Sequence, residues 1–95
     1  MKAAYNNIYI HYVLTVKDRE PHIRKAHRER IEKYMTGIFR NHACRVYSIY
    51  ANPEHVHVLI SKSPSISENE LILRVAISTA SFINKEKLSP SRFVW

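Results

Sequence analysis

The sequence predicts an α+β sandwich, in which one antiparallel sheet carries two helices on the same face. Three observations support this fold class. Apolar residues alternate with polar ones in three segments, and they recur at helical spacing in two others. These segments follow one another in the order βαββα, and a short apolar stretch at the end looks like the opening of a last strand. We expect residues 1–95 to form a single domain, because the length suits one modest core and no linker or repeat divides it.

The first strand is expected over residues 8–16, where alternate apolar residues share one face and Tyr9, His11 and Val13 share the other. Residues 44–51 and 55–61 are rich in β-branched and aromatic residues and predict two more strands. The turn at residues 52–54 contains a proline and joins these two strands into a hairpin.

The first helix is expected from about Pro21 to His42, with the proline near its start. Gly37 interrupts it at a cost of about 1 kcal/mol relative to alanine, so we expect a packing reason for this glycine. The second helix is expected to begin at the capping box of residues 67–70 and to run to about Lys87. Its predicted core face consists of Leu71, Val75, Ser78 or Thr79, Phe82 and Ile83.

Residues 92–95 are interpreted as a last strand that is cut short, which completes the order βαββαβ of the ferredoxin-like sandwich. In that topology the first and third strands are neighbours at the centre of the sheet. The sheet face away from the helices is then open to a ligand or partner.

The chain is strongly basic, with 15 Lys plus Arg against 8 Asp plus Glu, a net charge of +7. Such an excess favours phosphate backbones as partners, although small basic proteins of other classes share it. No apolar run is long enough for a membrane helix, and the N-terminus has no apolar signal segment. The single cysteine, Cys44, cannot form an internal disulfide, so a cytoplasmic location is the simplest expectation; Cys44 itself is interpreted as a small buried hydrophobe.

His55 and His57 lie two residues apart on the third predicted strand, so both side chains leave the same face, about 6.5–7 Å apart at Cα. Two imidazoles at this spacing can converge on one metal ion. Because Val56, Val58 and Ile60 occupy the core side, the histidines are expected on the open face. His11 has the same outward parity and is a candidate third ligand or partner of a ligand. A His-x-His pair can also simply decorate a polar sheet face, since two ligands do not make a complete site.

Residues 52–60, a Pro-Glu turn followed by His-hydrophobic-His and an aliphatic run, resemble the HUH motif of single-tyrosine transposases of the smallest bacterial insertion sequences, the IS200-like and REP-associated families. The resemblance covers the whole chain. It includes the opening strand at residues 9–14, the helix residues 31–38, and the closing segments 82–84 and 92–95.

The resemblance implies an enzyme that binds DNA hairpin ends, holds single-stranded DNA and cleaves it through a tyrosine nucleophile, usually as a homodimer. It also implies a divalent metal, Mg²⁺ or Mn²⁺, held by His55 and His57. In the family the tyrosine lies on a helix after the closing strand, one turn before a glutamine that completes the metal site. This position falls beyond Trp95, so none of the six tyrosines in the sequence matches it. The chain is therefore interpreted as the metal- and DNA-binding core without the catalytic helix.

Several basic residues are candidates for phosphate contact: Lys17, Arg24, Arg28 and, near the open sheet edge, Arg92. The alternative interpretation is a solvated helix face, because acidic residues are interspersed among them.

Three other functions fit parts of the sequence less well. A non-catalytic, DNA-binding remnant of a transposase is the main alternative. An RNA-recognition motif would need stacking aromatics where the third strand has His55 and His57, and a two-histidine phosphoesterase would need a second histidine motif.

Overall fold

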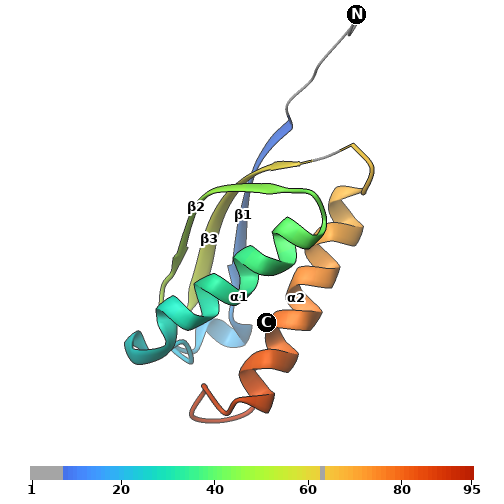
Figure 1. Ribbon diagram of the computed structural model, residues 1–95. Helices are drawn as coiled ribbons and strands as arrows, with labels where there is room; N and C mark the ends of the chain where they lie inside the picture. The colour runs from blue at the N-terminus through green and yellow to red at the C-terminus, as the bar shows by residue number, and fades with distance from the viewer. Residues whose placement is uncertain (1–7, 63) are drawn as a thin grey trace, which may run out of the picture.

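The computed structural model describes residues 8–62 and 64–95 and confirms the predicted order of the first three strands and both helices, βαββα (Figure 1). The strands and α-helices are β1 Ile8–Thr15, α1 Arg28–Asn41, β2 Arg45–Ala51, β3 His55–Lys62 and α2 Glu68–Lys85. Two short 3-10 turns, η1 Lys17–Arg19 and η2 Lys25–His27, lie between β1 and α1.

The sheet has the order β1-β3-β2, with both pairs antiparallel and β3 in the centre. β1 is the expected neighbour of β3, in a register that pairs Val13 with His57 and Thr15 with His55. Both helices lie on one face of this sheet, which leaves the other face without a helical cover (Figure 1).

The core lies between the sheet and the helices. Val56, Val58 and Ile60 of β3 are fully buried, as the alternation predicted. The helices contribute buried residues at helical spacing: Ile31, Met35 and Phe39 from α1, and Leu71, Val75, Thr79 and Ile83 from α2. Thr79, rather than Ser78, therefore occupies the position that the sequence left open. Within the described residues, neither helix is both long and apolar enough to cross a membrane.

The start of the first helix was predicted too early, because α1 begins at Arg28 and not near Pro21. Asp18 and Arg19 have φ of 58° and 55°, a left-handed backbone that does not propagate a helix. Ile23 is buried, and its N–H donates a hydrogen bond to the carbonyl of Pro53 at 3.0 Å. The apolar spacing that extended the predicted helix backwards thus reflects a loop residue packed into the core. The start of α2 was predicted correctly, since Ser67 caps it by accepting a hydrogen bond from the N–H of Glu70 at 3.1 Å.

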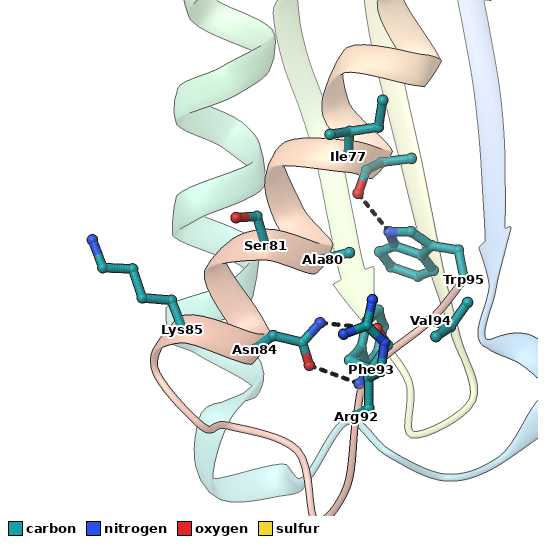
Figure 2. A pocket seen from close by; sticks show the side chains of 10 residues that line it. Ile77, Ala80, Ser81, Asn84, Lys85, Arg92, Phe93, Val94 and Trp95 are labelled. Carbon is teal, nitrogen blue, oxygen red and sulfur yellow. Dashed lines mark hydrogen bonds between the residues drawn. The ribbon is translucent and has the colours of Figure 1, made fainter.

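Residues 92–95 do not form the predicted last strand. Asn84 of α2 takes both backbone groups of Phe93: its amide nitrogen donates to the carbonyl at 3.0 Å, and its amide oxygen accepts from the N–H at 2.7 Å (Figure 2). The indole of Trp95 donates to the carbonyl of Ala76 (Figure 2). These contacts hold the segment against α2, beside a hollow of about 780 Å³. The N–H of Phe93 is therefore not available to a strand ladder.

Gly37 has no packing reason of the kind expected. A Cβ atom built at this position would meet nothing within 4 Å, and its φ is not positive. The glycine is exposed on the outer surface of α1.

Candidate functional site on the open sheet face

His55 and His57 lie together on the open face of β3, because every second residue of this strand is buried under the helices. Their rings meet edge to face, with centroids 4.5 Å apart and an interplanar angle of 81°. The two Nε2 atoms are 2.7 Å apart. The strand geometry therefore brings the same nitrogen of each ring to one point.

The other nitrogen of each ring contacts a different neighbour. Nδ1 of His55 lies 2.8 Å from the carboxylate oxygen Oε1 of Glu54. Nδ1 of His57 lies 3.3 Å from Nε2 of His11, whose ring stacks on that of His57. A carboxylate accepts only, so Nδ1 of His55 donates to Glu54, whereas either nitrogen of the His57–His11 contact can carry its proton. With the proton of His57 also on Nδ1, both Nε2 atoms would keep lone pairs, and two lone pairs 2.7 Å apart favour a cation or a shared proton between them.

The sequence made His11 a candidate third ligand or partner of a ligand. Its ring contacts Nδ1 of His57, the nitrogen that points away from His55. This geometry favours the second role, in which His11 orients a ligand ring. The side-chain amide of Asn52 lies beside the other histidine, with its Nδ2 3.3 Å from Nε2 of His55.

The donor set at this point is small. Across residues 8–62 and 64–95, no group of three or more His, Cys, Asp or Glu side chains is arranged to hold a metal ion. The histidine pair thus offers two nitrogen ligands, and further ligands would be oxygen atoms from water, from a phosphate or from another part of a complete site. Such a mixed set suits Mn²⁺, and it suits Mg²⁺ less well because Mg²⁺ prefers oxygen ligands.

Two tyrosines have structural roles. Tyr12 stacks on Phe39, and its hydroxyl donates to the carbonyl of Glu68 at 3.4 Å. Burial, and then electrostatic repulsion from Glu68 and Cys44 when the phenol ionises, raise the pKa of Tyr12 above its usual value, which makes its hydroxyl harder to activate as a nucleophile. Tyr34 stacks on Phe82 between the helices, with ring centroids 4.0 Å apart.

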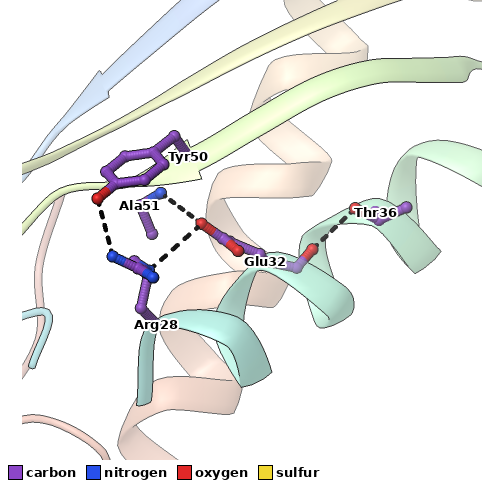
Figure 3. A network of polar contacts seen from close by, with 5 residues as sticks. All are labelled: Arg28, Glu32, Thr36, Tyr50 and Ala51. Atoms are coloured by element: carbon purple, nitrogen blue, oxygen red, sulfur yellow. Dashed lines mark hydrogen bonds and ion pairs between the residues drawn. The ribbon is translucent and has the colours of Figure 1, made fainter. Parts of the chain in front are cut away.

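Tyr50 borders the histidine site and was not predicted to do so. It pairs with His57 across the sheet and is half exposed. Its hydroxyl accepts a hydrogen bond from Arg28 at 2.8 Å, so it is directed at the start of α1 (Figure 3). Glu32 lies 4.0 Å from Arg28 and accepts a hydrogen bond from the backbone N–H of Ala51 at 2.9 Å (Figure 3). This network joins α1 to the end of β2.

Three of the four predicted phosphate-binding residues are carried by segments that adjoin the histidine end of the sheet. Lys17 follows β1 just beyond the Thr15–His55 pair. Arg24 follows Ile23, whose N–H donates a hydrogen bond to the carbonyl of Pro53 in the turn before His55. Arg28 binds Tyr50, the cross-strand partner of His57. Arg92 was predicted near the open sheet edge, but it lines the hollow beside α2, because Asn84 holds the neighbouring Phe93 there.

The family model described as "Transposase IS200 like" matches residues 4–95, nearly the whole chain. The chain belongs to the IS200-like transposase family.

A solved structure agrees with the fold of this transposase-family domain. It is a protein from Deinococcus radiodurans R1 described as a candidate transposase, and the match has a TM-score of 0.83 at 12% sequence identity. The alignment covers 90% of this chain and 66% of the solved chain, so this chain spans about two thirds of the length of that protein. Among the curated proteins, none matches this sequence.

Proposed function

We propose that this domain binds single-stranded DNA on its open sheet face and holds a divalent metal ion, Mn²⁺ or Mg²⁺, through His55 and His57. The proposed reaction is cleavage and rejoining of a DNA strand through a tyrosine nucleophile during transposition. The observation that carries the proposal is the convergence of two Nε2 atoms, 2.7 Å apart, on the open face of a domain in a transposase family.

The residues of this chain divide the work in the proposed reaction. His55 and His57 would hold the ion, while Glu54 and His11 keep their rings oriented. A bound divalent ion would act as a Lewis acid that neutralises charge developing on a phosphate. Lys17, Arg24 and Arg28 would hold the flanking phosphates, since their segments adjoin the histidines.

The nucleophile is assigned to none of Tyr12, Tyr34 and Tyr50. Tyr12 has a raised pKa in the core, Tyr34 lies between the helices, and the hydroxyl of Tyr50 is bound by Arg28. Tyr9 and Tyr47 are exposed and are not set aside by these contacts. The second candidate function is a non-catalytic remnant, in which the chain binds DNA without cutting it. A denaturation-resistant adduct between this chain and a hairpin oligonucleotide with a single-stranded tail would decide against that candidate.

The metal proposal is tested by titrating Mn²⁺ into the purified chain in a calorimeter. Replacing His57 by alanine removes one of two converging nitrogens, so we expect Mn²⁺ affinity to fall at least about tenfold. His42→Ala is the matched control, because His42 lies at the end of α1 and its backbone, not its side chain, caps that helix. Unchanged affinity in His57→Ala, or an equal loss in His42→Ala, would contradict the proposed site.

A further inference from the structure

Two tyrosines lie on the open sheet face, away from the histidine pair. Tyr9 of β1 is 57% exposed and Tyr47 of β2 is 45% exposed. Their ring centroids are 5.6 Å apart at an interplanar angle of 48°, so the two rings meet across the central strand β3. Large exposed rings in contact with each other form an apolar surface that a folded protein does not need for its core.

A β-bulge in β2 produces this arrangement. Val46 pairs with Ile60, whereas Ser48 pairs with Leu59, so Tyr47 is an extra residue without a partner in the register. In a regular strand Tyr47 and Ser48 would face opposite sides. Here Ser48 pairs with a residue of the open face, and Tyr47 also reaches that face to contact Tyr9. A bulge re-aims a side chain in this way at the cost of ladder hydrogen bonding.

A cation completes the surface. The guanidinium of Arg45 lies over the ring of Tyr47, 5.1 Å from its centroid. Arg45 and Tyr9 both pair with Ser61, one from each side of β3. Two exposed aromatic rings beside a fixed positive charge match the parts of a nucleotide, a flat base and a negative phosphate.

We propose that Tyr9, Tyr47 and Arg45, called here the tyrosine platform, stack a base of the single strand whose phosphate reaches the histidine pair. The inference rests on the proposed function and adds to it the residues that hold the bases. From His57 to Ser61 the strand advances four residues, about 13 Å. The platform therefore holds a nucleotide farther along the same strand, at a fixed distance from the histidines.

The charge of the molecule favours nucleic acid over a second copy of this chain on the platform. Two copies that met through this face would bring together two chains of net charge +7, with Arg45 of each at the contact. A duplex is a poorer fit, because the π-faces of its bases are covered by neighbouring base pairs. A single strand offers both the exposed base and the charge that the platform complements.

The experiment compares two labelled oligonucleotides of about ten residues, oligothymidylate and an abasic strand of the same length, by fluorescence anisotropy. Tyr47→Leu removes the stacking ring, and we expect it to weaken oligothymidylate binding at least about fivefold. Affinity for the abasic strand should stay the same, because its phosphates remain. Tyr47→Phe keeps the ring and should bind like the unchanged protein.

The remaining outcomes separate this inference from the proposed function. If oligothymidylate binds well but Tyr47→Leu and Tyr9→Leu leave its affinity unchanged, the tyrosine platform does not bind the base. The proposed histidine site is then still judged separately, by the Mn²⁺ titration. If the unchanged chain binds neither strand, the platform and the proposed DNA binding both fail. If Tyr47→Leu alters the sedimentation coefficient and not the DNA affinity, the face joins copies of the chain and the inference is overturned.

Discussion

Each of the two histidines on β3 has one ring nitrogen engaged by a neighbour and one that faces the other histidine. Glu54 engages His55 at 2.8 Å, and His11 engages His57 at 3.3 Å. Partners of this kind fix which nitrogen carries the proton and which way the ring points. In the proposed metal site, ion binding would therefore depend on two residues that would not touch the ion.

We expect Glu54→Gln to weaken Mn²⁺ binding by about tenfold, because removing a partner of a metal-binding histidine typically costs between 10- and 100-fold in affinity. A neutral amide can donate to Nδ1 as well as accept from it, so it no longer fixes the proton there. Calorimetric titration of Mn²⁺ measures the effect. Glu29→Gln serves as the control, since Glu29 lies on the exposed surface of α1 and pairs with Lys33. Equal Mn²⁺ affinities in the two variants would show that Glu54 does not position His55.

The sequence predicted the histidine pair, because a period of two alone places His55 and His57 on one face. It could not predict the role of Glu54, since the contact depends on how the turn before β3 directs that side chain. Tyr47 was missed for a different reason. A bulge breaks the period of two, and neither the residue types nor their spacing in residues 44–51 marks where the extra residue falls.

At the scale of elements, the regular strands and helices were predicted well where one face is buried. The errors lie at element ends that are fixed by contacts distant in sequence. The N–H of Ile23 binds Pro53, thirty positions along the chain, and the backbone of Phe93 is held by a side chain of α2. Ile23 and Phe93 are both apolar and buried. In the sequence they therefore look like core residues of a helix or strand, although each belongs to a loop.

The exposed glycine in α1 gives a testable prediction for the stability of this helix. Gly37→Ala should raise the free energy of unfolding by about 1 kcal/mol, because alanine restricts the unfolded chain and suits a helix interior better than glycine. The added methyl group meets nothing within 4 Å, so no strain offsets the gain. Urea unfolding followed by circular dichroism measures the change. A loss of stability would contradict the open space found around position 37.

For the whole molecule, the arrangement of charge links the separate parts of the site. Lys17, Arg24 and Arg28 belong to segments at the histidine end of the sheet, and Arg45 lies at the other end beside Tyr47. Basic residues thus lie in segments next to both ends of the central strand. This is the distribution expected if an extended, negatively charged strand runs along β3.

Binding of a single-stranded oligonucleotide should consequently weaken steeply as salt rises. If these four cations each neutralise one phosphate, the logarithm of the association constant should fall with the logarithm of salt concentration with a slope of about −3. Anisotropy titrations over a series of KCl concentrations give this slope directly. Arg24→Gln should make it shallower by about 0.7, the value for one phosphate contact on a single strand. Arg74→Gln is the charge-matched control, because Arg74 is exposed on α2 and paired with Glu70 on the helical side of the molecule. A flat salt dependence would rule out phosphate contact as the main source of affinity, and equal slopes in both variants would remove Arg24 from the path of the strand.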